Sequence, residues 1–326
     1  MEVVKKPLLG MNLLELKAVA KELGMPAFAG TQMAKWLYTQ HVASIDEMTN
    51  ISKANREKLA ENYTIGCRQH IDAQYSKDGT IKYLFPTEEG KFVETVYIPD
   101  DDRATLCVSS QVGCKMNCLF CQTGKQGFEG NLSAVDILNQ IYSLPERDKL
   151  TNIVFMGQGE PMDNYDNLVR FVRLLSSQEG LNISQRNITV STCGIVPNMY
   201  KLADEGLQIT LALSLHAPND EKRRELMPIA NKYSIDEILD ACRNYFAKTG
   251  RRITFEYSLV GGKNDSEADA KELSARISDI NCHVNLIPVN PIKERDYVKS
   301  TKKVVENFKN KLEKYGINVT IRREMG

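Results

Sequence analysis

Short β-branched runs alternate with amphipathic stretches through most of the chain after residue 100. The expected strands lie near residues 104–109, 152–156, 187–192, 208–215, 252–259 and 282–287, with a further strand at 317–322. Each of the first six is followed by a segment with helical periodicity, which makes six βα units. This alternation predicts a parallel sheet with helices outside it, either doubly wound or curved into a partial barrel, and periodicity alone does not distinguish the two.

The first hundred residues show a different pattern. Apolar residues line one face of a predicted helix before Gly24, and a second helical run covers Met33 to Tyr38; the first face contains Leu13, Leu14, Leu16, Val19, Ala20 and Leu23. Two β-rich runs, Ile81 to Phe85 and Phe92 to Ile98, flank a turn-like segment and predict a hairpin. We therefore expect an N-terminal helical domain over residues 1–75, a hairpin extension over 76–99 and an α/β core domain over 100–326.

Composition limits the class of protein and its partners. The chain has 326 residues, of which 42% are hydrophobic, so a sizeable core can form. Lys and Arg balance Asp and Glu at 42 each, so an RNA partner would have to be held by local basic patches. Such patches are expected at Lys222-Arg223-Arg224, Arg251-Arg252, Arg322-Arg323 and a lysine-rich stretch with Lys299, Lys302, Lys303, Lys309 and Lys311. They could contact phosphates, although most lysines on helix faces are simply solvated.

The cellular location follows from what the sequence lacks. The N-terminal residues contain no apolar segment typical of a secretory signal, and no stretch approaches the roughly 20 apolar residues of a membrane span. We expect a cytoplasmic monomer without membrane contact. The reducing cytoplasm also suits eight cysteines.

Polar residues gather at or just after the ends of the predicted strands. They occur at the cysteine-rich segment after the first strand, at Gly157-Gln158-Gly159-Glu160-Pro161, at Ser191-Thr192, at Ser214-Leu215-His216 and at Asn290-Pro291. The carboxyl ends of parallel strands form one rim, and this rim is where ligands bind in barrels and in open α/β sheets. Five segments that are distant in sequence are therefore predicted to form one site.

The cysteine-rich segment carries the most specific signal. Cys114, Cys118 and Cys121 form a C-x3-C-x2-C cluster, in which each thiolate can bind one iron of a 4Fe-4S cube and leave the fourth iron open. This spacing resembles that of the radical S-adenosylmethionine (SAM) superfamily, whose open iron binds SAM. Two alternatives remain: Cys107 could complete a four-thiolate zinc site, and a disulfide framework is less favoured because the core needs no staples.

Other polar residues have both a functional and an ordinary interpretation. Gly159 permits close approach of a ligand to the backbone, and Glu160 could accept a hydrogen bond from the amine of SAM, although strand-to-helix turns are common. Ser191, Ser214 and Asn290 could bind a ribose or a carboxylate, or serve as caps. A histidine such as His216 is more often a structural donor than an acid-base group. By default Cys107 is a buried, inert thiol, Glu94 points to solvent, and the four other cysteines pack in the core: Cys67, Cys193, Cys242 and Cys282.

Three longer segments carry a more specific signal: residues 93–99, residues 106–114 and residues 214–220. They resemble the RlmN/Cfr family of radical SAM adenosine methyltransferases, and the likeness extends in order from the helical module to Arg323. The resemblance implies a partial (β/α)6 barrel, a 4Fe-4S cluster on the three cysteines, an external electron donor and methylation of carbon 2 of an adenosine in 23S ribosomal RNA, and in some members also in tRNA. Relatives that methylate carbon 8 share the same machinery. The positions that match SAM contacts are Gly159, Glu160, Ser191, Ser214, Leu215, His216 and Asn290.

The resemblance also implies a reaction scheme. Carbon 2 of adenine is electrophilic, so a polar transfer from SAM finds no electron pair there, and a radical route avoids this obstacle. In the family scheme, a tail cysteine is first methylated by one SAM, and a second SAM supplies the radical that activates this methyl group. Cys107 matches the cysteine that resolves the RNA adduct by forming a disulfide with the tail cysteine, and Glu94 matches a proposed acid-base position.

The sequence departs from the family pattern at its end. The family tail continues into an Ala-Ala-Cys-Gly segment that bears the methyl-carrying cysteine, whereas this sequence stops at Gly326 without it. We expect a shortened form of an active adenosine-C2 methyltransferase. The alternatives are a radical SAM enzyme for another substrate and a catalytically silent RNA-binding or assembly protein.

Overall fold

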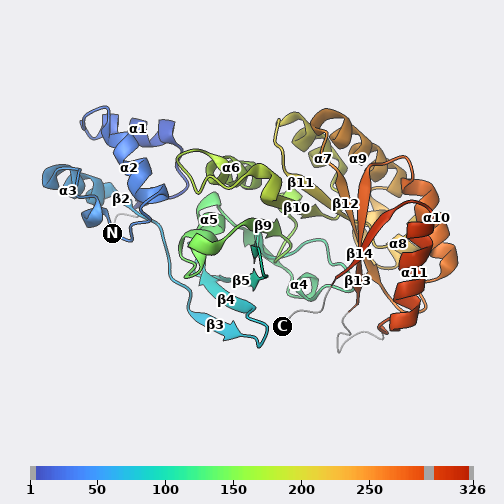
Figure 1. Cartoon of the computed structure of the whole chain (residues 1–326). Coiled ribbons are helices and arrows are strands. Elements are labelled where there is room, and N and C mark those ends of the chain that lie inside the picture. Colours follow the sequence, from blue (N-terminus) through green and yellow to red (C-terminus); the bar gives the residue numbers. More distant parts are fainter. Residues whose placement is uncertain (1–4, 290–296, 323–326) are drawn as a thin grey trace. The chain divides into compact units, whose positions relative to one another are not determined.

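The computed structural model describes residues 5–289 and 297–322 (Figure 1). These residues belong to two compact units. The first unit contains the chain up to Ser109 together with residues 131–153 and 166–184, and the second contains residues 110–130, 154–165 and the chain from Gln185. Within the described residues, no helix is long and apolar enough to cross a membrane.

Three helices open the first unit: α1 (Leu13–Glu22), α2 (Ala29–Tyr38) and α3 (Lys53–Asn62). A capping box of Asn12 and Glu15 starts α1, because each side chain accepts a hydrogen bond from the other residue's backbone N–H. Leu16, Val19 and Ala20 are buried as the apolar pattern predicts. Leu14 was expected on the same face, but it is 77% exposed because it lies on the opposite side of the helix. A short parallel pair, β1 (Lys6–Pro7) with β2 (Tyr63–Thr64), joins the two ends of this helical segment.

The strands of the first unit form an antiparallel run. It contains β3 (Asp72–Tyr75), β4 (Ile81–Pro86), β5 (Phe92–Pro99) and β6 (Ala104–Cys107), each paired antiparallel with the next. The predicted hairpin of β4 and β5 is confirmed, with Tyr83 opposite Thr95. The strand predicted to begin the parallel sheet, β6, pairs antiparallel with β5, so that the hairpin continues into it and the sheet is mixed.

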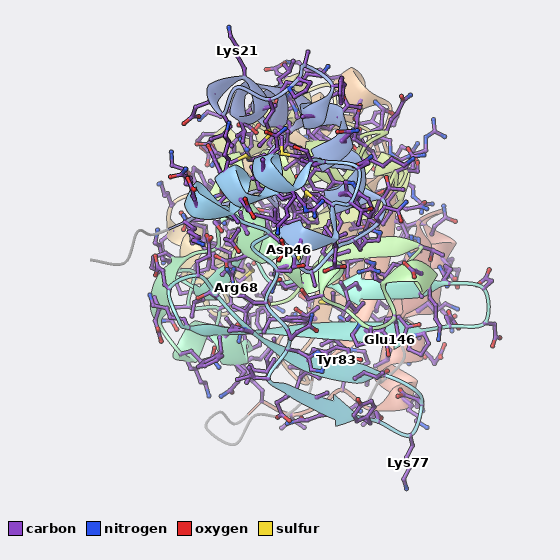
Figure 2. All side chains as sticks on the ribbon, turned by 90° about the vertical axis from the view of Figure 1, so that its left-hand side faces the viewer. Lys21, Asp46, Arg68, Lys77, Tyr83 and Glu146 are labelled. Atoms are coloured by element: carbon purple, nitrogen blue, oxygen red, sulfur yellow. The ribbon has the colours of Figure 1, made fainter. Side chains whose placement is uncertain are left out.

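Helices α5 (Ala134–Tyr142) and most of α6 (Tyr165–Ser176) also belong to the first unit, whereas β9 (Asn152–Phe155) is divided between the two units. The Tyr83 hydroxyl donates to Glu146 Oε2 at 2.9 Å, just after α5 (Figure 2). Arg68 forms an ion pair with the buried Asp136 of α5. Glu146 follows α5 and Arg68 precedes β3, so these contacts connect α5 and the residues after it with β4 and with the segment that leads to β3.

The second unit contains the predicted βα repeats. Strands β10 (Ile188–Thr192), β11 (Thr210–Ser214), β12 (Ile253–Leu259), β13 (Cys282–Pro288) and β14 (Asn318–Ile321) pair in parallel in sequence order. The connecting helices are α7 (Val196–Asp204), α8 (Asp220–Arg224), α9 (Ile235–Thr249), α10 (Glu267–Ile277) and α11 (Lys302–Lys314). Leu211, Ala212 and Leu213 of β11 are fully buried, as expected for a strand covered on both faces.

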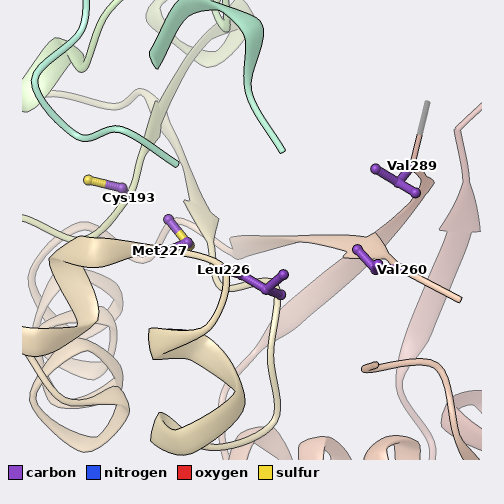
Figure 3. Packing of buried hydrophobic residues seen from close by; sticks show 5 residues of the cluster. All are labelled: Cys193, Leu226, Met227, Val260 and Val289. Atoms are coloured by element: carbon purple, nitrogen blue, oxygen red, sulfur yellow. The ribbon is translucent and has the colours of Figure 1, made fainter. Parts of the chain in front are cut away.

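The cysteine-rich segment lies in the second unit between two short strands. It follows β7 (Gln111–Gly113), contains α4 (Gln122–Lys125) and ends at β8 (Phe128–Asn131). Five buried residues form the hydrophobic cluster beneath it: Cys193, Leu226, Met227, Val260 and Val289 (Figure 3). Met116, Cys118 and Phe120 pack against this cluster. Apolar contacts therefore anchor the segment that carries the cysteines.

Candidate active site

A cavity of about 290 Å³ lies within the second unit. Cys114, Cys118 and Cys121 line it together with residues from the carboxyl ends of the parallel strands. The predicted residues that share this lining are Gly159, Glu160, Ser191, Ser214 and His216. The structure thus brings together four of the five segments that the strand-end pattern singled out. Asn290, from the fifth, lies outside the described residues, as does the basic residue Arg323.

The cysteine segment is shaped by backbone contacts as well as by apolar packing. Leu119 N donates to Leu226 O at 2.9 Å, and Cys121 N donates to Cys118 O at 3.0 Å. Burial raises the pKa of the Cys114 thiol to about 11 and that of Cys118 to about 12. Both thiols are therefore protonated at neutral pH in the protein without a metal, and ligation of iron would displace their protons.

The three thiols line the same cavity. Across the described residues, no three Cys, His, Asp or Glu side chains are grouped closely enough to hold one metal ion. A 4Fe-4S cube does not need such a group, because each cysteine binds a different iron. Three half-buried thiols facing one cavity therefore fit a cube with one open iron.

The Gly-rich turn after β9 brings a buried carboxylate to the cavity. Glu160 is 4% exposed, and its two carboxylate oxygens accept from the backbone N–H groups of Met162 at 3.0 Å and Cys193 at 2.8 Å. Burial raises its pKa, and these hydrogen bonds oppose the shift. Gly159 has φ +96°, and a Cβ there would lie 2.5 Å from Cβ of Gln111. The turn therefore requires glycine, as the sequence suggested.

Two serines face the cavity from neighbouring strands. The hydroxyl oxygens of Ser191 in β10 and Ser214 in β11 are 3.4 Å apart. They form a pair of groups that can donate to and accept from one polar ligand. Leu215 differs, because its side chain is buried and its backbone N–H donates to Glu256 O at 3.1 Å. Any contact of Leu215 with a ligand would therefore involve the backbone.

His216 is held in one orientation. It has φ +58°, its Nδ1 accepts from Ser258 N at 2.9 Å, and its ring meets that of Phe120 edge-on at 4.7 Å. Burial lowers its pKa to about 3, so the ring is neutral at physiological pH. Because Nδ1 is an acceptor, the proton is assigned to Nε2. This geometry fits a structural role for His216 better than an acid-base role. Its Nε2–H is the ring donor that can still bind a ligand.

The lowered pKa of His216 predicts that the protein loses stability in acid. Its folded pKa is lowered, so the unfolded chain takes up a proton first as the pH falls, and stability is lost from about pH 6.5 toward pH 3. The loss amounts to about 1.4 kcal/mol per pH unit. We expect His216→Gln to remove it, so that between pH 6.5 and about pH 5 the unfolding free energy of the wild-type protein falls by about 2 kcal/mol more than that of the variant.

Urea unfolding at several pH values measures this difference. His41 and His283 also have lowered pKa values, and the raised pKa values of Glu160 and Glu256 act with the opposite sign. All four groups are present in both proteins, so the comparison isolates His216. Equal pH slopes in the two proteins would contradict the assignment.

Cys107 and Glu94 lie in the first unit, on β6 and β5. Cys107 pairs with Val96 across the two strands and is half-buried, so the default expectation of a buried thiol is wrong. Glu94 Oε1 forms an ion pair with Lys82 Nζ at 3.0 Å, and its side chain is 45% exposed, as expected for a hairpin strand. Both side chains retain access to solvent, which a role on a large substrate requires.

The structure also reveals residues that the sequence did not single out. Glu256 lines the cavity at 5% exposure and accepts from Asn285 Nδ2 at 2.8 Å; a carboxylate inside an apolar strand was the signal for it. Cys193, expected only in the core, is buried and also lines the cavity.

Arg223 was predicted in a phosphate-binding patch, but it is 0% exposed, so that prediction is wrong. Its neighbour Lys222 is paired with Asp269 at 2.6 Å.

Two family models match parts of this chain. A sequence model described as the radical SAM superfamily matches residues 108–274. A second model, described as the ribosomal RNA large subunit methyltransferase N-terminal domain, matches residues 6–65. The first match contains the three cysteines and Glu160.

Similar proteins cover nearly the whole chain. A "Probable dual-specificity RNA methyltransferase RlmN" of Lachnoclostridium phytofermentans is 54% identical over 97% of this chain and 90% of its own length. A protein of the same description from Clostridium perfringens is 50% identical over 98% of this chain and 93% of its own length. The crystal structure of a radical SAM methyltransferase from Sphaerobacter thermophilus superposes with a TM-score of 0.94, at 41% identity, over 98% of this chain and 96% of that one. This likeness confirms the fold class that the sequence predicted.

Proposed function

This chain belongs to the radical SAM RNA methyltransferases of the RlmN family, and on that premise we propose that it methylates carbon 2 of an adenosine in 23S ribosomal RNA and in tRNA. The relatives are described as dual-specificity RNA methyltransferases, and the N-terminal match is to a ribosomal RNA methyltransferase domain. The observation that carries the proposal is the single cavity shared by three cysteines, Glu160 and the Ser191–Ser214 pair.

The proposal gives each side chain of the cavity a role. Cys114, Cys118 and Cys121 would hold the cluster, and the cluster with SAM supplies a 5′-deoxyadenosyl radical when both are bound. Glu160 would accept from the amine of SAM, because two backbone N–H groups already hold its carboxylate in place. The Ser191–Ser214 pair and the Nε2–H of His216 would bind the polar groups of the same molecule.

Cys107 and Glu94 would act on the RNA after the methyl group has been attached. In the proposed sequence, the radical adduct would return one electron to the oxidised cluster and give its carbon-2 proton to Cys107. The Cys107 sulfur, deprotonated again, would then attack the tail sulfur, so that a disulfide forms and the sulfur–methylene bond breaks. The electron pair of that bond stays on the methylene carbon, which takes up a proton and becomes the methyl group. Glu94 would act as an acid-base group. The target adenosine must first leave its stack, as in other enzymes that modify bases.

The test compares the 326-residue chain with a chain extended by the family's Ala-Ala-Cys-Gly segment. Each is loaded with iron and sulfide without oxygen and incubated with protein-free 23S RNA or tRNA, labelled SAM and dithionite. We expect the extended chain to methylate both RNAs at carbon 2, as mapped by mass spectrometry. Methylation at carbon 8, a product from another substrate, or RNA binding without any 5′-deoxyadenosine would contradict the proposal.

Replacing Cys107 by Ala in the extended chain separates attachment of the methyl group from its release. We expect a protein with the wild-type iron content that forms less than about 1% of the wild-type amount of methylated RNA, since removing a group that acts directly in the chemistry costs 10²-fold or more. A covalent RNA–protein adduct should accumulate, visible on a denaturing gel. Cys282→Ala, at a buried core position in the second unit, is the matched control and should release product normally. Full turnover by Cys107→Ala would show that Cys107 is not needed to release the methylated RNA.

A further inference from the structure

Arg223 is a completely buried arginine in the second unit. It lies near the end of the short helix α8 and is 0% exposed. Its Nε donates to Leu215 O at 3.1 Å, and its Nη2 donates to Cys193 O at 2.6 Å and to Ser214 O at 3.3 Å. The guanidinium therefore connects the carboxyl ends of β10 and β11, where the Ser191–Ser214 pair is located.

These contacts do not neutralise the charge. All three acceptors are backbone carbonyls, which are polar but uncharged, and Nη1 is buried with no hydrogen-bond partner among the described residues. A buried cation costs several kcal/mol unless opposite charge lies nearby. Asp220 of the same helix supplies some opposite charge, but the effect of burial is larger. The fold therefore maintains a positive charge that the carbonyl groups and this carboxylate only partly compensate, which needs an explanation.

The cysteine segment packs against the same part of the fold. Leu226 and Met227 follow α8 directly, and both belong to the hydrophobic cluster on which Cys118 packs. Leu226 O accepts from Leu119 N at 2.9 Å. Cys193, whose carbonyl Arg223 binds, belongs to the same cluster (Figure 3). Cys193 also lines the cavity together with Cys114, Cys118 and Cys121, so Arg223 binds the backbone of a residue in the wall of the candidate cluster site.

We propose that Arg223 is a positioning residue whose buried charge raises the reduction potential of the cluster held by Cys114, Cys118 and Cys121. The inference rests on the proposed role of these cysteines. Reduction transfers one electron from an external low-potential reductant to the cluster, without making or breaking a bond, and adds one negative charge. A nearby cation in a poorly screened interior stabilises the more negative state. The same guanidinium holds the strand ends that carry the Ser191–Ser214 pair.

The experiment separates charge from packing by comparing three variants of the loaded protein. Arg223→Met removes the charge with a similar side-chain length, and Arg223→Lys keeps the charge but loses the planar fork. Arg251→Met is the matched control, because Arg251 Nη2 donates to Thr210 at 2.9 Å, at the opposite end of β11 from Ser214. The readout is the midpoint potential, obtained from the electron paramagnetic resonance signal of the reduced cluster in a redox titration without SAM.

At a fixed potential, we expect Arg223→Met to lower the ratio of reduced to oxidised cluster about tenfold, equivalent to about 59 mV for a one-electron couple. Arg223→Lys and Arg251→Met should stay within about twofold of wild type, as expected for changes that leave this charge in place. Equal potentials for Arg223→Met and Arg251→Met, or an equal loss in Arg223→Lys, would overturn the proposal.

Cluster loading keeps the test decisive where a variant is unstable. If Arg223→Met folds without binding iron, Arg223→Gln, which also removes the charge, takes its place in the titration and should show the same lowered potential. If neither variant binds iron, Arg223 supports the local fold only and the proposal is wrong. A wild-type protein that binds no iron would instead refute the proposed function, so the two failures are distinguishable.

Discussion

Cys118→Ala is expected to reduce SAM cleavage to 5′-deoxyadenosine by at least about 10³-fold, because loss of one of three thiolates leaves the cube without a stable attachment. Cys118 lines the cavity together with Cys114 and Cys121, and its side chain packs on the hydrophobic cluster. The variant should contain little iron and show little visible absorption after oxygen-free reconstitution. Iron analysis and chromatography of the reaction products measure both effects.

The matched control is Cys242→Ala, which removes a fully buried thiol from α9. This variant should keep its iron and its SAM cleavage, and show only a modest loss of stability. Wild-type iron content in Cys118→Ala, or an equal loss of iron in both variants, would remove Cys118 from the ligand set. Stoichiometric zinc in place of iron in the wild-type protein would refute the radical mechanism altogether.

Gly113→Ala should be the most damaging single-methyl change in the cysteine segment. Gly113 has φ +72°, and an added Cβ would lie 1.7 Å from Gly127 O, the same oxygen that accepts from Cys114 N at 2.9 Å. The backbone conformation alone costs an L residue about 1–2 kcal/mol. The clash with a carbonyl must also be relieved, so we expect a total loss of more than about 4 kcal/mol. Urea unfolding and iron content provide the measurement.

Gly206→Ala controls for the backbone strain. Gly206 has φ +69°, but an added Cβ there would meet no atom within 4 Å. We expect a loss of about 1 kcal/mol and a normal iron content. Similar losses in the two variants would show that β7 and β8 move apart easily, and that the close approach of Gly113 to Gly127 does not shape the cysteine segment.

The sequence predicted the elements well where local pattern dominates. The expected helical face with Leu16 and Val19, the hairpin and the parallel strands β10 to β13 are all present. These elements are set by hydrogen bonding and side-chain period, which a local window contains. Leu14 was assigned to the wrong face, because the helical period places it opposite the buried Leu16. The antiparallel pairing of β6 was not predicted, because it depends on which neighbour the strand meets.

The surroundings of charged and polar side chains were predicted less well than the helices and strands. Arg223 and Lys222 are adjacent and look alike in sequence, yet the first is buried against three carbonyls and the second forms an ion pair with Asp269. Cys193 is buried as expected, but it also faces the cavity and donates its N–H to Glu160. Whether a charged side chain is solvated, forms an ion pair or is buried depends on residues that are distant in the sequence, and a short window of sequence does not contain them.

The sequence by itself determined the chemistry available to this protein: three thiols at the spacing of an iron–sulfur cube and polar residues at successive strand ends. Only the tertiary structure decided which of these groups share a cavity, and that the charge of Arg223 is enclosed next to the cysteine segment. Ligand type and spacing along one segment are covalent properties of the chain. The burial of a charge and the meeting of distant strand ends exist only after the core has formed, because both depend on the exclusion of water by many residues together.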